Sequence, residues 1–148
     1  MHTTSTSTTA GKSTRQTSPD AIQLLTKDHK EVKALFQKYK KLASADGDAS
    51  DRQKLAAQIC TMLIAHSGIE KEIFYPAARE AGVEADLLDE AEVEHASVEE
   101  LISQIQAMSP DEDLYDAKVT VLGEYVNHHV KEEEDEMFPK CRKAKMDL

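Results

Sequence analysis

Apolar side chains recur along this chain at alternating intervals of three and four residues, which is the repeat of an α-helix with one buried face. Four segments carry the repeat, at about residues 20–42, 50–81, 84–108 and 111–143. Short stretches containing helix-breaking Gly, Pro or Asp separate them, at residues 45–48, at Gly82 and at residues 109–111. Long helices with short connections pack as antiparallel neighbours. We therefore predict an all-α protein with an antiparallel up-down-up-down four-helix bundle.

One face of each predicted helix carries the residues that we expect in the core. These are Leu25, His29, Val32, Phe36 and Tyr39 in the first helix; Leu55, Ile59, Met62, His66, Ile69 or Glu70, and Ile73 in the second; Leu88, Ala91, His95, Val98, Ile102 and Ile105 in the third; and Leu122, Val126, His129, Glu133 and Met137 in the fourth. Ser18 is predicted to cap the first helix, with Pro19 and Asp20 in its first turn. Gly82 is expected to end the second helix. The inward faces thus include one histidine from each helix.

The composition agrees with a helical protein and divides the chain into a tail and one domain. The 148 residues include only 5 Gly and 4 Pro and no Trp, while Ala, Leu, Glu and Lys are abundant. Residues 1–18 are rich in Ser and Thr and are predicted to form a disordered tail. Residues 19–145 are predicted to form the bundle, a single domain large enough for one hydrophobic core.

Charge, hydropathy and cysteine content argue against a nucleic-acid or membrane partner, a secretory signal and a disulfide framework. The formal net charge is −10, whereas nucleic acid or an anionic membrane requires a basic face, so we expect neither as a partner. No run of about 18 apolar residues could span a membrane, and the N-terminus has no secretory h-region. Cys60 and Cys141 have neither metal-ligand spacing nor the density of a disulfide framework. We expect a cytoplasmic protein, with a monomer as the default.

One spacing of polar residues occurs twice in the chain: a His, a Glu four residues later, and a Pro six residues after the Glu. The two copies are His66–Glu70–Pro76 and His129–Glu133–Pro139. On a helix, residues four apart lie on one face and about 6 Å apart along the axis, so each copy places an imidazole beside a carboxylate. His29 and His95 add one imidazole from each of the other helices. Counting from the predicted helix ends places all four histidines at one level, roughly 15–20 Å from one end of the bundle.

Two explanations compete for these residues. A single inward histidine is usually a polar core residue with a hydrogen-bond partner. Two inward glutamates at the same level are harder to explain, because burying an unpaired carboxylate costs several kcal/mol. Neutral imidazole binds iron, zinc or copper, and a carboxylate between two metal ions can bridge them. Four His and two Glu at one depth therefore favour a site for two metal ions.

The order and spacing of these residues resemble the hemerythrin-like (HHE cation-binding) family. The likeness covers about residues 20–143 and includes the Ile-Phe-Tyr-Pro and Met-Phe-Pro sequences after the two glutamates. The resemblance implies a non-haem di-iron centre with an oxo or hydroxo bridge, and hence two Fe ions per chain. By the matching positions, the metal ligands would be His29, His66, Glu70, His95, His129 and Glu133. In this set the two glutamates would bridge the ions, and the histidines would be terminal ligands.

One position departs from the family pattern. Oxygen-carrying hemerythrins have two histidines four apart on the third helix, whereas this helix has only His95. Glu99, Glu92 or water could take the missing place, although Glu99 is more simply explained as a surface acid in a run with Glu100. Added carboxylate or water would change the redox potential and open coordination positions. This favours reaction with peroxide or nitric oxide, or a sensing or storage role, over reversible oxygen carriage.

The second copy of the motif allows two registers. His128 and Glu132 have the same spacing one residue earlier, but only His129 and Glu133 keep the distance to the following proline and continue the apolar stripe. We therefore predict the later pair as ligands and place His128 at the boundary of the site.

Neighbouring aromatic residues and prolines receive structural interpretations. Tyr39, Tyr75 and Tyr125 are interpreted as core or boundary residues rather than redox tyrosines. Pro76 and Pro139 are expected to free a carbonyl one turn earlier and to bend their helices.

These features favour a non-haem di-iron protein that binds or reduces a small oxidant such as O2, H2O2 or NO. Peroxidase-like, catalase-like or NO-reducing activity is one form of this hypothesis, although no residue stands out as a general acid. The alternative is a non-catalytic iron or oxygen sensor, or an iron store. A ferritin-like enzyme would use Glu-x2-His on two helices, whereas only Glu92 and His95 have that spacing. A metal-free interaction module would require six inward polar residues to share one level by accident.

Overall fold

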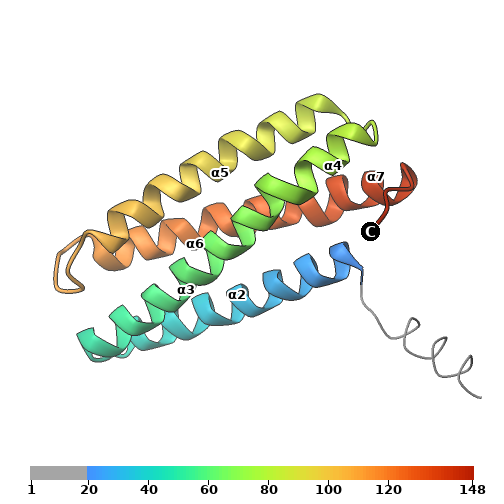
Figure 1. Ribbon diagram of the computed structural model, residues 1–148. Helices are drawn as coiled ribbons and strands as arrows, with labels where there is room; N and C mark the ends of the chain where they lie inside the picture. The colour runs from blue at the N-terminus through green and yellow to red at the C-terminus, as the bar shows by residue number, and fades with distance from the viewer. Residues whose placement is uncertain (1–19) are drawn as a thin grey trace, which may run out of the picture.

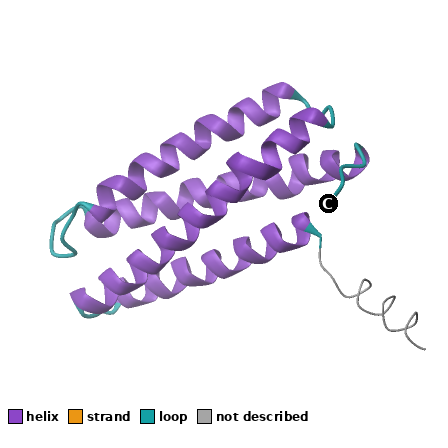
Figure 2. Ribbon diagram, in the orientation of Figure 1, coloured by secondary structure: helices purple, strands orange, loops and turns teal. Residues whose placement is uncertain are grey.

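The computed structural model describes residues 20–148, which form four helical segments (Figures 1 and 2). The segments are α2 (Ala21–Ser44); α3 (Ala49–Ile69) continuing through the π-helical turn η1 (Glu70–Phe74) into α4 (Tyr75–Glu80); α5 (Ala85–Gln106); and α6 (Tyr115–Glu132) continuing through the π-helical turn η2 (Glu133–Met137) into α7 (Phe138–Lys143). Residues 20–148 contain no β-strand, so the predicted all-α fold is confirmed. The predicted tail at 1–18 lies outside the described residues. Within the described part of the chain, no helix has the length and apolar character needed to cross a bilayer.

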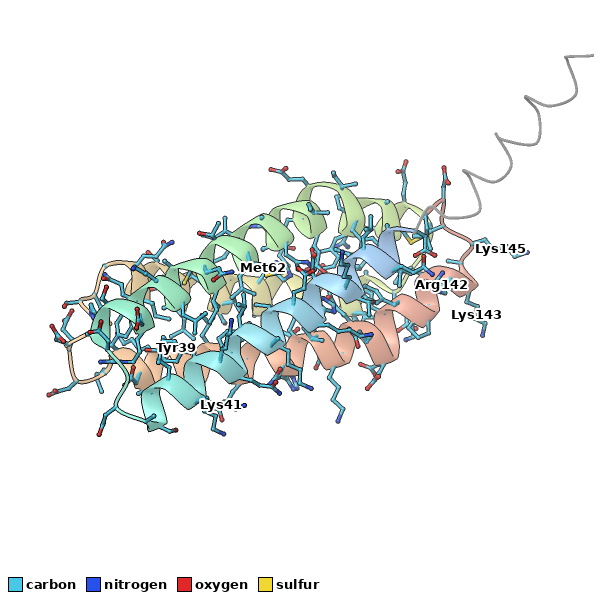
Figure 3. The ribbon with its side chains drawn as sticks, turned by 90° about the horizontal axis from the view of Figure 1, so that it is seen from below. Tyr39, Lys41, Met62, Arg142, Lys143 and Lys145 are labelled. Carbon is cyan, nitrogen blue, oxygen red and sulfur yellow. The ribbon has the colours of Figure 1, made fainter. Side chains whose placement is uncertain are left out.

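The segments are arranged as an antiparallel ring. α2 packs against α3, α3 against α5, α5 against α6, and α6 against α2. Figure 1 shows that consecutive segments run in opposite directions, and that the start of α2 lies at the same end of the bundle as the C-terminus. At that end the Ala21 N–H donates to the Leu148 carbonyl (3.2 Å), and Arg142, labelled in Figure 3, pairs with Asp20 (2.9 Å). This is the predicted up-down-up-down bundle.

The first helix is capped by Asp20. The Asp20 carboxylate accepts a hydrogen bond from the Gln23 N–H (2.8 Å), and the Gln23 side chain accepts one from the Asp20 N–H (2.9 Å). These reciprocal bonds form a capping box, which satisfies two N–H groups at the helix start. The prediction of Ser18 as the cap is therefore wrong, because the carboxylate two residues later fills that position.

Glycines follow the ends of the first two helical segments and have different roles there. Gly82 has φ +92°, a left-handed conformation that glycine adopts at low cost, as expected for a helix C-terminus. At Gly47, a Cβ atom would lie 2.4 Å from Leu42 Cδ1, so a larger residue would collide with the last turn of α2.

The last connection is longer than the sequence suggests. α6 begins at Tyr115, whereas the predicted helix begins near residue 111. In between, the Glu112 side chain accepts a hydrogen bond from the Ser109 N–H (2.5 Å), and the Ser109 hydroxyl accepts one from the Asp111 N–H (3.5 Å). Side chains that bond to nearby backbone groups compete with helical hydrogen bonds, so this segment forms turns.

The two π-helical turns change which side chains face the core. The Tyr75 N–H donates to the Glu70 carbonyl, five residues earlier, and the Phe138 N–H donates to the Glu133 carbonyl in the same way. A π turn contains one more residue than an α turn, so the following side chains shift around the helix axis. The residue five positions after each glutamate, Tyr75 or Phe138, therefore lies on the same face of the helix as that glutamate.

This shift makes one core prediction wrong. Ile73 is 65% exposed, whereas Phe74 and Tyr75 are 4% and 7% exposed. In an uninterrupted α-helix, Ile73 would lie close to the face of Glu70. The extra residue of η1 turns it outward and brings the next two side chains into the core.

We expect substitutions on this turn to report the π-helical register. Phe74→Ala should lower the free energy of unfolding by about 3–5 kcal/mol, the usual cost of truncating a buried Phe. Ile73→Ala, the matched control one residue earlier, should change it by less than about 0.5 kcal/mol. Urea unfolding at equal metal loading measures both values. A greater loss for the Ile73 variant would contradict the observed register.

Two hydrophobic clusters fill the bundle, one on each side of the histidine level. The first includes Val32, Tyr39, Ile59, Leu63, Ile102, Ile105, Val119, Leu122 and Val126. The second, nearer the chain ends, includes Ile22, Leu25, Phe74, Tyr75, Ala78, Leu88, Met137, Phe138 and Cys141. Cys60 and Cys141 are free, lie in different clusters, and have thiol pKa values raised to about 11 by burial. Neither thiol is therefore set up for reaction.

Candidate metal centre

Buried polar side chains gather at one level of the bundle, between the two hydrophobic clusters. Within residues 20–148 they are His29, His66, Glu70, His95, His129 and Glu133, the same six residues that the motifs contain. Glu70 and Glu133 are only 0% and 1% exposed. Carboxylates buried so deeply lose their hydration and require compensating positive charge.

The four histidines form two pairs. The Nε2 atoms of His29 and His66 lie 3.2 Å apart, and those of His95 and His129 lie 3.1 Å apart. Ligand atoms at right angles on one ion, with bonds of about 2.1 Å, are separated by about 3.0 Å. Each pair thus has a spacing that a single metal ion can occupy.

Both carboxylates lie between the two histidine pairs. Glu70 Oε2 lies 3.3 Å from His66 Nε2, and its Oε1 lies 3.0 Å from His95 Nε2. Glu133 Oε1 lies 3.1 Å from His29 Nε2, and its Oε2 lies 3.3 Å from His129 Nε2. Each carboxylate therefore presents one oxygen to each pair, the arrangement needed to bridge two ions.

The outer ring nitrogens have partners of their own. The Nδ1 contacts are His29 with Glu134 (2.7 Å), His66 with Asp28 (3.0 Å), His95 with the Ser67 hydroxyl (2.7 Å), and His129 with Glu94 (2.7 Å). An Nδ1–H that donates to a carboxylate leaves the lone pair on Nε2. Hydrogen bonds of this kind hold the rings with Nε2 toward the centre and make them better metal ligands.

These outer partners follow a simple sequence rule. Each is the immediate neighbour of one inward residue and bonds to the histidine of the adjacent helix. Asp28 precedes His29 and bonds to His66, while Glu94 precedes His95 and bonds to His129. In the same way, Ser67 follows His66 on α3 and bonds to His95 of α5. Glu134 follows Glu133 in η2 and bonds to His29 of α2. The helical stripes do not predict them, although a polar residue beside every inward ligand position is a signal that could have found them.

We expect Glu94→Gln to weaken metal binding 10- to 100-fold, the usual effect of changing a partner of a ligating histidine. The amide cannot supply the negative charge that now faces His129 Nδ1. Glu90→Gln, one turn earlier on α5 at an exposed position, is the matched control and should leave affinity unchanged. Competition with a chelator measures both. Equal affinities in the two variants would contradict this role of Glu94.

Without a metal ion, the neighbouring carboxylates raise the pKa values of His29, His66 and His129. Burial alone would lower the pKa of His129, but Glu133 and Glu70 outweigh it and raise this pKa to about 11. Burial likewise opposes ionisation of Glu70, yet contacts with Glu133 and the surrounding histidines hold its pKa well below the usual range. The buried carboxylates thus draw positive charge to the site. Because metal ligation requires neutral imidazole, a metal ion would replace these protons.

Among the buried side chains of residues 20–148, two carboxylate oxygens have no hydrogen-bond partner. They are Glu70 Oε2 and Glu133 Oε1, both facing the His29 and His66 pair. A buried carboxylate oxygen without a donor is costly, and a cation at this position would compensate it. Imidazole and carboxylate are ligands that iron accepts readily. The residues present therefore fit a metal ion.

Tyr75, interpreted from the sequence as a core or boundary residue, reaches the centre of the site. Its hydroxyl lies 3.0 Å from His95 Nε2, 3.1 Å from His129 Nε2 and 3.2 Å from Glu70 Oε1, and it also contacts Glu133 Oε2. Only the π turn η1 brings this side chain to the face of Glu70, so an uninterrupted helical repeat cannot predict it.

The other candidates from the sequence lie elsewhere. Glu99 pairs with Lys71 (2.9 Å), and Glu92 is exposed, so neither contacts His95. The side chain of His128 is 69% exposed and pairs with Glu132 (2.9 Å) on the surface. Of the two registers, only His129 and Glu133 therefore lie inside the bundle.

A small cavity adjoins the four histidine rings. Its volume is about 40 Å³, and its apolar lining consists of Val32, Met62, Leu63, Val98, Val126 and Val130. A water molecule needs roughly 10–15 Å³ on this measure, so the cavity admits only a molecule of a few atoms. Tyr75 does not line it, because the cavity lies on the side of the first hydrophobic cluster.

Comparison with known proteins agrees with the geometry. A family model described as the hemerythrin HHE cation binding domain matches residues 20–141. A protein of Nostoc sp. (strain PCC 7120) named DNA nickase is 31% identical over 115 residues, covering 78% of this chain and 31% of that protein. The chain thus spans less than a third of that relative's length. No solved structure matches this chain. The family match and the His/Glu cluster indicate a metal-binding protein, with iron as the favoured metal. The chain belongs to the hemerythrin HHE cation-binding family.

Proposed function

We propose that this protein holds two iron ions and uses them to bind or reduce a small oxidant, namely O2, H2O2 or NO. The proposed ligands are His29, His66, Glu70, His95, His129 and Glu133, with the two glutamates as bridges. The observation that carries this proposal is the pair of buried carboxylates that each present one oxygen to each histidine pair. An iron pair bound there would supply the electrons for reduction.

The protein's own residues have three tasks in this function. The Nδ1 partners orient the imidazoles, and the two glutamates compensate the charge of the ions. The cavity of about 40 Å³ beside the histidines limits access to very small molecules. Its apolar lining favours uncharged molecules such as O2 and NO over hydrated ions.

The DNA-nicking activity in the name of the Nostoc relative is not part of this proposal. The match covers only 31% of that protein. The net charge of −10 is also unsuited to a phosphate backbone, which is bound chiefly by Lys and Arg. We further expect a monomer in a reducing compartment such as the cytoplasm, where two free buried cysteines are stable.

Iron content and reactivity test the proposal. The purified, iron-reconstituted protein should contain two irons per chain. It should also show near-ultraviolet oxo-to-iron bands that bleach with dithionite and return in air. Rapid mixing of the reduced protein with O2, H2O2 and NO then identifies the oxidant. Metal binding without turnover would favour the sensor or store, whereas stable zinc or no metal despite available iron would contradict the proposal.

A further inference from the structure

We propose that Tyr75 is an additional protein ligand to the metal ion held by His95 and His129. This inference rests on the proposed two-metal function and concerns how the two metal positions differ.

Three atoms define the proposed metal position at His95 and His129. Tyr75 Oη, His95 Nε2 and His129 Nε2 form a nearly equilateral triangle with sides of 3.0, 3.1 and 3.1 Å. Three ligands at right angles to one another on a single ion, with bonds of about 2.1 Å, form a triangle with sides of about 3.0 Å. The observed triangle is therefore the one that three adjacent ligands of one metal ion would form.

The single proton of the phenol does not satisfy this cluster. A phenol has one hydrogen to donate. The Tyr75 hydroxyl nevertheless meets two ring nitrogens and two carboxylate oxygens, from Glu70 and Glu133. Once a metal ion has replaced the proton on His129 Nε2, the Nδ1 contact with Glu94 leaves a lone pair on Nε2, which faces the phenol. A metal ion at this point would satisfy these lone pairs together, which the single phenol proton cannot do.

At the other metal position, the matching residue of the second motif supplies no such oxygen. In the second copy of the motif, the residue five after the glutamate is Phe138, whose ring is stacked on that of His29 with centroids 5.9 Å apart. Phe138 has no donor atom, so among residues 20–148 the group at His29 and His66 consists of two imidazoles and one oxygen from each bridging carboxylate. We infer that the open coordination positions are concentrated at His29 and His66, because the phenol fills one at the other ion.

The fold holds Tyr75 in place. The π turn η1 directs the side chain inward, and its ring packs edge-to-face against that of His95, with centroids 5.3 Å apart. On binding, the phenol O–H bond would be replaced by an oxygen–metal bond, and the proton would leave to solvent with no change in metal oxidation state. A negatively charged phenolate would stabilise iron(III) and lower the reduction potential of the ion it binds.

Visible absorption and resonance Raman spectra of the oxidised, iron-loaded protein test this assignment. Phenolate bound to iron(III) produces a visible charge-transfer band, and excitation in that band enhances tyrosinate ring vibrations. Wild-type protein and Tyr125→Phe should show both signals. Tyr75→Phe should lose them while retaining the near-ultraviolet oxo-to-iron bands. Tyr125 is the matched control because it lies one turn before His129 on α6 but is 48% exposed.

Wild-type protein decides the question if Tyr75→Phe does not fold or bind iron. Ring-deuterated tyrosine should then shift the enhanced vibrations. Tyr39 and Tyr115 cannot be their source because both lie in the first hydrophobic cluster, where the Tyr39 hydroxyl donates to Asp116. Two bound irons without a tyrosinate signal, or a signal that persists in folded Tyr75→Phe, would overturn the inference and leave the proposed function standing. Failure of the wild type to bind iron would instead overturn the proposed function.

Discussion

Glu70→Gln is expected to reduce the iron content of the protein from two ions per chain to one or none. Glu70 is fully buried and lies within 3.3 Å of Nε2 atoms from both histidine pairs. An amide fills the same space but removes one of the two negative charges between the ions, which raises their mutual repulsion. It also lacks the two equivalent oxygens that a bridging ligand requires. Mass spectrometry of the metal in the reconstituted, desalted variant measures the effect.

Glu132→Gln is the matched control for this substitution. Glu132 belongs to the alternative His-x3-Glu pair and contacts His128 on the surface, 2.9 Å away. This variant should retain two irons, because none of the six central donors changes. Loss of iron in Glu132→Gln together with full iron in Glu70→Gln would show that the ligand assignment is wrong.

Removal of the metal should lower the melting temperature of the wild type by on the order of 10 °C. A metal that binds only the native state, at a free concentration 1,000 times its Kd, adds about 4 kcal/mol to the free energy of unfolding. The chelated protein would have four histidines and two glutamates facing one another at one level, with only protons to compensate the carboxylates. Differential scanning calorimetry before and after chelation measures the change.

A variant that cannot hold the metal controls for effects of the chelator itself. The double variant Glu70→Gln, Glu133→Gln should have nearly the same melting temperature with and without chelator. An unchanged melting temperature in fully demetallated wild-type protein would contradict a structural contribution from the metal.

The helical repeat was sufficient to predict the bundle and the residues at its centre. His29, for example, lies between Leu25 and Val32 on the apolar stripe of α2, so its inward direction follows from spacing alone. The His-x3-Glu motif added the carboxylates, because residues four apart share a helix face.

The repeat failed where the helix geometry changed. After Glu70 the chain makes a π turn, so Ile73 faces solvent and Tyr75 reaches the site. A pattern with a constant period of 3.6 residues cannot include that extra residue. The Nδ1 partners were missed for a different reason: residues such as Asp28 and Glu94 act across helices, so their roles depend on which helices are neighbours.

The most direct test of the two-iron site is anomalous diffraction at the iron edge from crystals of the iron-loaded protein. We predict two iron peaks that share Glu70 and Glu133 as ligands. One should lie beside His29 and His66, and the other beside His95 and His129. A single peak, or iron only at the surface group of Glu94, His128 and Glu132, would contradict the site described above.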